Sequence, residues 1–488
     1  MLFNSWTFAV FLVVVFALHY VVRNALWQAL VLTAGSFVFY GWGPDHLRLV
    51  PLLAASTLVN GVAAQVLLSP KAPEARKKWA FALALAFNLG ALCFFKYARL
   101  LGETLLPTAW WAKWEPVLGH IPLPIGISFY TFQGISLISE AWRARQTGLP
   151  GLESPQGMRQ TFWFHTKVWF FKAFFPQLVA GPIVKAHEFL HQIGFKRLAS
   201  IDWDGAVRKL VLGFFLKMVI ADNLTEATGV LDHSAQVAQS SRLNLLAMLY
   251  GFSFKIFADF AGYSLIAQGL AKLFGYELPI NFNFPYLSRS ITEFWRRWHI
   301  SLSSWLREYL YFPLGGSRLG PFRTYINLSL VMFLGGLWHG AEWRFAIWGA
   351  AHGVLLAAER LFQGDARRTA GKPGWNWLGT LQAVMVFNVV SVLWLLFKLP
   401  DFNALVVFFR AFASQGGAVH TREIFAIVLF SLPPLAWHLF EAVRAADNRW
   451  KRFGQLQYAR LNTMAYAIML ALIVLNSGAA GEFIYFQF

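Results

Sequence analysis

The sequence predicts an all-α, polytopic integral membrane protein, and two observations carry this prediction. Only 14% of the 488 residues are charged and 57% are hydrophobic, whereas a water-soluble domain has about 25% charged residues. Apolar runs long enough to span a membrane, about 17–25 residues, recur along the whole chain. So few charged side chains leave too little polar surface for a water-soluble protein, and we therefore expect most of the chain to lie in lipid.

The apolar segments are expected to be helices that span or half-span the bilayer. They lie near residues 6–22, 26–42, 47–69, 79–97, 121–139, 162–182, 206–228, 242–273, 324–339, 343–363, 377–398, 402–415, 422–442 and 461–478. Glycine and proline interrupt several of them, so the count is open by about two or three. We find neither a fixed repeat nor a flexible linker, and we predict one transmembrane domain over 1–488, with its catalytic core in 289–340.

Basic residues in the short loops predict the orientation. Arg23 and the segment 71–78 (KAPEARKK) follow the first and third apolar segments, and the loops at 365–372 and 444–452 are also basic. Short basic loops face the cytoplasm and its anionic lipids. This places the N-terminus outside and assigns the net charge of +18 to the membrane, which excludes nucleic acid as the partner. The first residues lack the positive region of a signal peptide, so the first apolar run is expected to remain as a membrane helix.

Residues 289–323 differ from the rest of the chain because they hold six arginines against two glutamates, with aromatic residues between them. Ser290 and Glu293 have the spacing of a capping box, so we expect one helix to begin there. Three- and four-residue spacing predicts one apolar stripe along it: Phe294, Trp298, Leu302, Trp305, Tyr309 and Phe312. Two polar rows lie beside that stripe: Arg296, His299, Ser303 and Arg307, and Arg297, Ser301, Ser304 and Glu308.

Two interpretations of this helix remain open. It could lie in the membrane interface, with arginines at the phosphate headgroups and aromatic residues at the lipid boundary. Alternatively, the polar face lines a water-filled chamber in which arginines bind an anionic substrate such as a phosphate-bearing acyl carrier.

His339 lies in an apolar segment at residues 335–340 (GGLWHG). An ionisable group there is costly and usually lines a cavity or a pathway, and glycines would let backbone or substrate approach closely. His299 also follows a tryptophan, and an imidazole can accept a hydroxyl proton near neutral pH. His352 is interpreted as structural. The single cysteine, Cys93, excludes a disulfide framework, and no metal site is predicted.

Several motifs together resemble the bacterial membrane-bound O-acyltransferase (MBOAT) family. They are 294–303 (FWRRWHISLS), 306–310 (LREYL), 335–340 (GGLWHG), 123–130 (LPIGISFY), 175–182 (FPQLVAGP) and 259–264 (DFAGYS). The resemblance covers residues 1–365 well and the remainder loosely. It is most similar to the membrane subunits of alginate, peptidoglycan and cellulose O-acetylation systems.

The resemblance implies a ring of tilted helices with re-entrant helices around a central funnel or tunnel. It also implies that His339 is the catalytic histidine and His299 the second, supporting one. We assign Trp298, Trp338 and Ser303 to substrate binding, with Arg296, Arg297 and Arg307 for the phosphates of the donor. The sequence departs from the family at Leu265, where an acidic residue usually follows the DFAGYS motif, which weakens a catalytic role for that segment, here taken as a loop.

The C-terminus, 483–488 (FIYFQF), has two interpretations. Aromatic residues at a chain end commonly anchor it at the membrane interface. However, a similar Phe-x-Tyr ending is found on the small partner peptide of teichoic-acid D-alanylation, where it is thought to accept the acyl group. A phenol, with a pKa of about 10, is a better leaving group than a sugar hydroxyl, so Tyr485 is predicted to act as a covalent acyl relay.

These observations predict an acetyltransferase of the bacterial inner membrane. We expect acetyl-CoA as the donor, no tightly bound cofactor, and a separate periplasmic acetyltransferase- or esterase-like partner that modifies a polysaccharide. The alternatives are D-alanyl transfer to teichoic acid and, outside the enzymes, a transporter or flippase of an acyl donor. Transporters often show paired halves with broken helices, and the sequence shows no such internal symmetry.

Overall fold

The computed structural model describes residues 1–363, 377–414, 416–446, 455–476 and 483. Within these residues every regular element is a helix, and pairing between strands is limited to two isolated β-bridges. The chain divides into two compact units, Met1–Lys209 with Ile266–Pro279, and Leu210–Leu265 with Ile280–Phe488. The all-α prediction is therefore confirmed for the described part of the chain.

Among the residues that the structure describes, six helices are long and apolar enough to cross a membrane. They are Val50–Leu68, Glu74–Leu105, Arg242–Leu273, Trp343–Phe362, Trp377–Lys398 and Thr421–Val443. Shorter apolar helices are Trp6–Val21, Ala25–Tyr40, Phe402–Ala413 and Thr463–Leu475. The protein is a multi-pass membrane protein, as its composition indicates.

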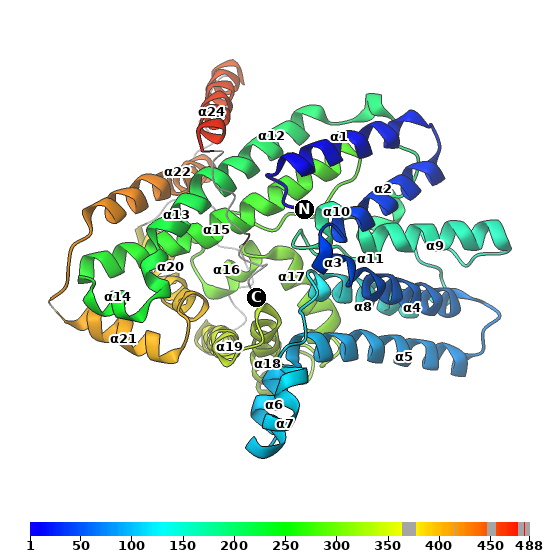
Figure 1. Ribbon diagram of the computed structural model, residues 1–488, viewed down its shortest axis with the longest axis horizontal. Coiled ribbons are helices and arrows are strands. Elements are labelled where there is room, and N and C mark those ends of the chain that lie inside the picture. Colours follow the sequence, from blue (N-terminus) through cyan, green and yellow to red (C-terminus); the bar gives the residue numbers. More distant parts are fainter. Residues whose placement is uncertain (364–376, 415, 447–454, 477–482, 484–488) are drawn as a thin grey trace. The chain divides into compact units, whose positions relative to one another are not determined.

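The first unit contains the N-terminal helices (Figure 1). They are α1 (Trp6–Val21), α2 (Ala25–Tyr40), α3 (Pro44–Leu47), α4 (Val50–Leu68), α5 (Glu74–Leu92), η1 (Cys93–Tyr97), α6 (Ala98–Leu105), α7 (Thr108–Leu118), α8 (Ile127–Arg143), α9 (Met158–Ala173), α10 (Phe175–Leu178), α11 (Ala186–Phe189), η2 (Leu190–Gln192) and η3 (Leu198–Ser200). Helix α4 packs against α5, α8 and α9. The pair α6–α7 was not anticipated from the sequence.

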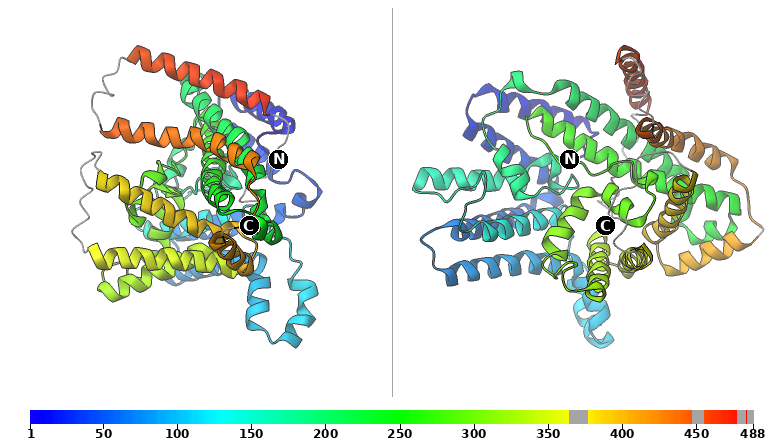
Figure 2. Two further views of the ribbon diagram at one scale, coloured as in Figure 1. Left: turned by 90° about the vertical axis from the view of Figure 1, so that its left-hand side faces the viewer. Right: turned by 180° about the vertical axis from the view of Figure 1, so that it is seen from behind.

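The second unit contains the remaining described helices. Two helices, α12 (Trp203–Phe214) and α15 (Arg242–Leu273), have residues in both units. The other elements are η4 (Phe215–Ala221), α13 (Asp222–Ala227), η5 (Gly229–Asp232), α14 (Ser234–Gln239), η6 (Pro285–Leu287), α16 (Ile291–Arg297), α17 (Ile300–Leu306), η7 (Arg307–Tyr311), α18 (Pro321–His339), α19 (Trp343–Gln363), α20 (Trp377–Lys398), α21 (Phe402–Ala413), α22 (Thr421–Ala446) and α24 (Gln455–Leu475). Helices α18 and α19 lie side by side, and α20 packs on α19 (Figure 2).

Polar side chains define several helix starts. The Asn24 side chain accepts hydrogen bonds from the backbone N–H groups of Leu26 and Trp27 at the start of α2. Asp401 accepts from the Ala404 N–H at the start of α21. The first N–H groups of a helix have no partner within it, so such a side chain stabilises the end by about 1 kcal/mol. This local chemistry fixes where α2 and α21 begin, within one residue of the expected segments 26–42 and 402–415.

Candidate active site

The arginine-rich segment is two helices rather than one. Ser290 caps α16 as expected, because its hydroxyl accepts from the Glu293 N–H at 3.1 Å. The helix then ends at Arg297, since Trp298 is extended and His299 adopts a left-handed backbone conformation with φ 43° before α17 begins. The prediction of one continuous helix with straight side-chain rows was therefore wrong.

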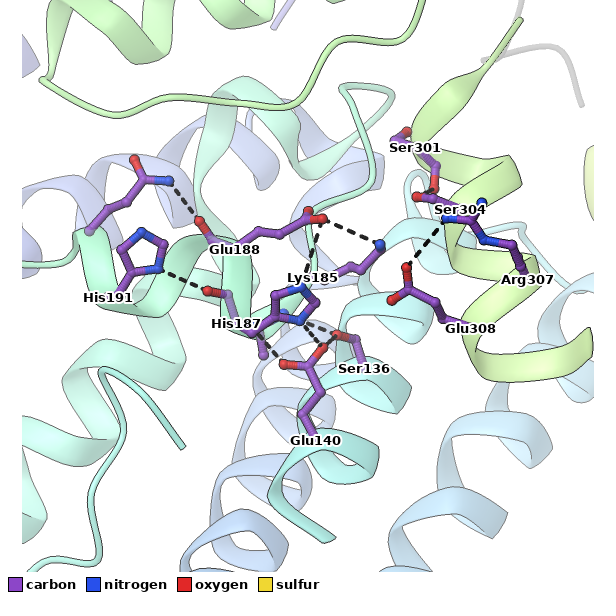
Figure 3. Close-up of polar contacts among 12 residues, drawn as sticks. Ser136, Glu140, Lys185, His187, Glu188, His191, Ser301, Ser304, Arg307 and Glu308 are labelled. Carbon is purple, nitrogen blue, oxygen red and sulfur yellow. Dashed lines mark hydrogen bonds and ion pairs between the residues drawn. The ribbon is translucent and has the colours of Figure 1, made fainter. Parts of the chain in front are cut away.

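The three predicted donor-binding arginines differ in their contacts. The Arg297 guanidinium pairs with Glu293 at 2.8 Å and donates to the Asn283 carbonyl at 3.1 Å. Arg296 is exposed on α16. Arg307 is also exposed and lies 3.9 Å from the Glu308 carboxylate (Figure 3). Arg297 thus supports the local fold, whereas the guanidinium groups of Arg296 and Arg307 remain accessible.

The glycines near His339 serve helix packing. A Cβ atom on Gly336 would lie 2.2 Å from the Phe345 carbonyl oxygen, and one on Gly349 would lie 2.2 Å from the Met332 carbonyl oxygen. Helices α18 and α19 therefore approach through small residues, as membrane helices commonly do. We expected these glycines to let backbone or substrate approach closely, and at Gly336 it is the backbone of α19 that approaches.

The structure brings His299 and His339 together. His339 is the last residue of α18, and its ring centroid is 6.1 Å from that of His299. Trp338 lies 5.9 Å from the His299 ring and 5.0 Å from the His339 ring. His299 is fully buried, and His339 is 4% exposed. Two imidazoles that are forty positions apart in the sequence thus form one buried pair.

Aromatic rings surround this pair. Trp348 lies 5.4 Å and Phe397 lies 5.3 Å from the His339 ring, and Phe260 lies 4.6 Å from the His299 ring. Burial among uncharged groups disfavours the imidazolium, and it lowers the pKa of His299 from 6.5 to about 3. His299 is consequently neutral at physiological pH, so it acts through hydrogen bonding or packing rather than through a positive charge.

The side chains of Trp298 and Ser303, which we assigned to substrate binding, contact neighbouring protein groups. Trp298 is buried, stacks on Phe294 with a centroid distance of 5.6 Å and packs on Trp394 at 5.0 Å. Ser303 is half-buried, and its hydroxyl donates to the Trp298 carbonyl at 3.4 Å. These contacts attach both side chains to the turn that carries His299.

His352 also lies near this aromatic group. The Trp295 indole N–H donates to the His352 Nδ1 at 3.3 Å, and the Trp348 ring lies 4.8 Å from the imidazole. The imidazole therefore joins α16 to α19, which agrees with the structural role expected for it.

Sequence reasoning missed the contribution of the DFAGYS motif, which was discounted as a loop although it lies in the segment 242–273 that was expected to be a helix and forms α15. Asp259 is buried and pairs with Lys217 at 3.0 Å, and Phe260 packs on His299. Tyr263 stacks on Phe483 with a centroid distance of 4.4 Å. Because residues three and four apart share a helix face, Phe260, Tyr263 and Ser264 form one surface towards the site; the aromatic and small residues at this spacing were the available signal.

Tyr485 lies outside the described residues, whereas Phe483 is buried. Among the residues that the structure describes, no group of three His, Cys, Asp or Glu side chains could hold a metal ion.

A second polar cluster lies in the first unit (Figure 3). The buried Glu140 carboxylate accepts from the His187 N–H at 2.6 Å and from the Ser136 hydroxyl at 2.9 Å, and it pairs with the His187 imidazole at 3.0 Å. Lys185 pairs with Glu188 at 3.3 Å. These contacts tie the start of α11 to α8, and the sequence analysis did not anticipate them.

Comparison with known proteins agrees with the motifs. The model of the MBOAT, membrane-bound O-acyltransferase family, matches residues 167–397, which include both histidines. The chain is 35% identical to the "Probable alginate O-acetylase AlgI" of Azotobacter vinelandii over 418 residues, 85% of this chain and 79% of the relative. The protein belongs to the membrane-bound O-acyltransferase family. It is therefore a membrane-bound acyltransferase, and the predicted family is confirmed.

Two further relatives of this O-acyltransferase are named for different transferred groups. The "Peptidoglycan O-acetyltransferase" of Helicobacter pylori is 32% identical over 417 residues, 82% of this chain and 77% of the relative. The "Teichoic acid D-alanyltransferase" of Bacillus subtilis is 28% identical over 340 residues, 65% of this chain and 82% of the relative. The acetylating relatives thus match at higher identity and over more of the chain.

Proposed function

We propose that the protein transfers acetyl groups from cytoplasmic acetyl-CoA across the bacterial inner membrane for the O-acetylation of a cell-surface or extracellular polysaccharide. The observation that carries the proposal is the buried pair of His299 and His339, with ring centroids 6.1 Å apart, in a multi-pass O-acyltransferase. The similarity to alginate and peptidoglycan O-acetylating proteins supports acetyl as the transferred group and a polysaccharide as the final acceptor. We propose alginate, peptidoglycan or cellulose as that polysaccharide.

In the proposed reaction, His339 is the general base. The acceptor hydroxyl oxygen attacks the thioester carbonyl carbon, while the hydroxyl proton passes to the His339 imidazole. The C–S bond breaks, and the departing CoA thiolate receives the proton. A positioned imidazole accelerates such a proton transfer by about 10²–10⁴-fold. The neutral His299 orients His339 or contacts the donor.

The accessible arginines are proposed to bind the phosphates of the donor. Arg296 and Arg307 have exposed guanidinium groups, and a guanidinium binds phosphate oxygens in a bidentate fashion. Arg297 would first have to release Glu293, so we propose a smaller part for it. Trp298, Trp338 and Ser303 would support the donor site through the turn at His299.

We further propose the fold implied by the family: a ring of tilted helices with re-entrant pieces around a central funnel. The short helices α16 and α17, broken at His299, are the candidates for re-entrant segments. No tightly bound cofactor is proposed, and a periplasmic acetyltransferase- or esterase-like partner would pass the acetyl group to the polymer.

Tyr485 is proposed as the first acyl acceptor within the chain. Phe483, two residues earlier, packs on Tyr263, and its ring lies 6.1 Å from Phe260, the residue against His299. The described residue Phe483 thus lies close to the histidine pair, which supports the proposed role of Tyr485 in the reaction.

Proteoliposomes containing the full-length protein and acetyl-CoA labelled in the acetyl group test these proposals. We expect label to become attached to the chain, and Tyr485→Phe to abolish that attachment. Arg296→Ala should raise the KM for acetyl-CoA, while Arg318→Ala, an exposed arginine of the same segment outside the predicted rows, serves as the matched control. If label crosses the bilayer without becoming attached to the chain or to an added acceptor, the protein is a transporter and the proposal fails.

D-alanyl transfer is the second candidate, and the similarity to the Bacillus subtilis D-alanyltransferase favours it. That reaction uses a thioester on a carrier protein, so labelled D-alanyl carrier protein replaces acetyl-CoA in the same assay. Attachment of D-alanine but not of acetyl would replace the first proposal with the second.

A further inference from the structure

A short segment outside the helices, residues 281–283, holds the turn that carries His299. The Ile300 N–H donates to the Asn281 carbonyl at 3.0 Å, and the Asn283 N–H donates to the Arg297 carbonyl at 3.0 Å. These two hydrogen bonds lie on either side of Trp298 and His299. The break between α16 and α17 is therefore fixed from outside by residues 281–283.

The Asn281 side chain caps the start of α17, where the N-cap residue itself supplies no side-chain capping hydrogen bond. His299 occupies the N-cap position of α17, and its side chain makes no capping hydrogen bond there. Instead, the Asn281 Oδ1 accepts from the Ser301 hydroxyl at 2.6 Å and from the Ser301 N–H at 3.3 Å. A backbone N–H only donates, so this contact fixes which end of the amide faces α17.

The other end of the amide contacts α15. The Asn281 Nδ2 donates to the Ser264 hydroxyl at 3.0 Å, and the Asn281 side chain is buried. Ser264 lies one helical turn after Phe260, whose ring packs on His299 at 4.6 Å. One face of α15 thus supports the imidazole directly through Phe260 and supports the backbone beside it through Asn281.

This support matters because the His299 conformation is unfavourable. A φ of 43° brings the Cβ atom of a residue other than glycine close to the following carbonyl oxygen. Such a conformation persists only where its surroundings impose it. The hydrogen bonds that Asn281 accepts from Ile300 and Ser301, the two residues that follow His299, supply this constraint.

We infer that Asn281 is a positioning residue for His299: by capping α17 from a distant segment, it imposes the left-handed turn that directs the imidazole towards His339. The inference rests on the proposed acyl transfer for its activity measurement. Misplacing a functional group by about 1 Å can lower a rate by about 100-fold.

Acetyl transfer by the reconstituted full-length protein tests this inference. We expect Asn281→Ala to lower kcat by about 100-fold. Asn281→Asp should recover most of that loss, because a carboxylate keeps the acceptor for Ser301 at a helix N-terminus, where negative charge is favoured. Asn283→Ala is the matched control: the same residue type two positions away, exposed, and joined to Arg297 through its backbone only.

A double variant separates positioning from general stability. If Asn281 acts through His299, Asn281→Ala should cause no further loss in a His299→Ala background. The inference is overturned if Asn281→Ala has normal kcat, if the loss is as large without His299, or if Asn281→Asp is no better than Asn281→Ala. Should Asn281→Ala fail to accumulate as folded protein, Asn281→Ser takes its place with the same criteria.

Thermal unfolding in detergent tests this inference independently of the proposed function. If the wild-type protein transfers no acetyl group, the proposed function fails, but the capping remains testable. The unfolding midpoint of Asn281→Ala with Ser301→Ala should then equal that of Asn281→Ala alone, because both changes remove the same contact. Additive shifts of the midpoint would overturn the inference.

Discussion

His299 and His339 lie side by side, yet the chain positions them by different physical means. His339 ends a regular helix, and its position follows from the close packing of α18 on α19 at Gly336 and Gly349. His299 interrupts a helix, and its position follows from a left-handed turn that is held by hydrogen bonds accepted by Asn281. One imidazole is thus placed by helix packing and the other by a capped break.

The difference shows how a membrane site can be built from two kinds of constraint. Close packing tolerates loss of a polar group but not added volume. A hydrogen-bonded turn tolerates changes in volume but not loss of its acceptor or of its backbone conformation. Substitutions around each histidine should therefore fail in different ways.

Removal of the His339 imidazole is expected to have the largest effect. His339→Ala should lower kcat for acetyl transfer by about 10²–10⁴-fold, because it removes the general base, while the protein remains folded in detergent. Acetyl transfer from labelled acetyl-CoA measures the change. Wild-type transfer by His339→Ala would refute the assignment of the catalytic residue.

The second largest effect is expected when volume is added at the contact between α18 and α19 that positions His339. Gly336→Ala places a Cβ atom 2.2 Å from the Phe345 carbonyl oxygen, and overpacking of this kind costs about 1–3 kcal/mol. Gly335→Ala is the matched control, since its Cβ atom would lie 3.2 Å from the Leu306 Cδ1, a side-chain atom that can move. Thermal unfolding midpoints should fall for Gly336→Ala and change little for Gly335→Ala; the opposite order would contradict the packing argument.

The stability of the protein should depend on pH through His299. Its pKa is about 3 when folded and about 6.5 when unfolded, so the unfolded chain binds more protons below pH 6.5. Stability contributed by the neutral imidazole is complete above that pH, and about 2 kcal/mol of it is lost on lowering the pH to about 5. Unfolding midpoints measured from pH 7 to 5 should fall less steeply for His299→Asn than for the wild type; equal slopes would refute the low pKa.

The smallest expected effect concerns the backbone at His299. Both His299→Asn and His299→Val remove the imidazole, but asparagine tolerates the left-handed conformation far better than a β-branched residue. His299→Val should therefore unfold at a lower midpoint, by an amount equivalent to about 1–2 kcal/mol. Equal midpoints would show that the turn imposes no strain.

Much of the fold was predictable because the bilayer imposes a strong constraint on composition. Helices α15, α19 and α20 match the expected segments 242–273, 343–363 and 377–398 at both ends. The start of α16 was also predictable, because a capping box is local chemistry. The α6–α7 pair was not, because its helices are short and carry no apolar run of spanning length.

The sequence by itself determined the all-α membrane class, the family motifs and the two histidines, because these depend on composition and on residues close together in the chain. Only the tertiary structure decided that α16 ends at Arg297, that the Arg297 guanidinium donates to the Asn283 carbonyl, and that Asn281 caps α17. These features depend on contacts between segments distant in the sequence. A helical pattern of side chains does not encode them, because a break imposed by a distant hydrogen bond leaves the local periodicity unchanged.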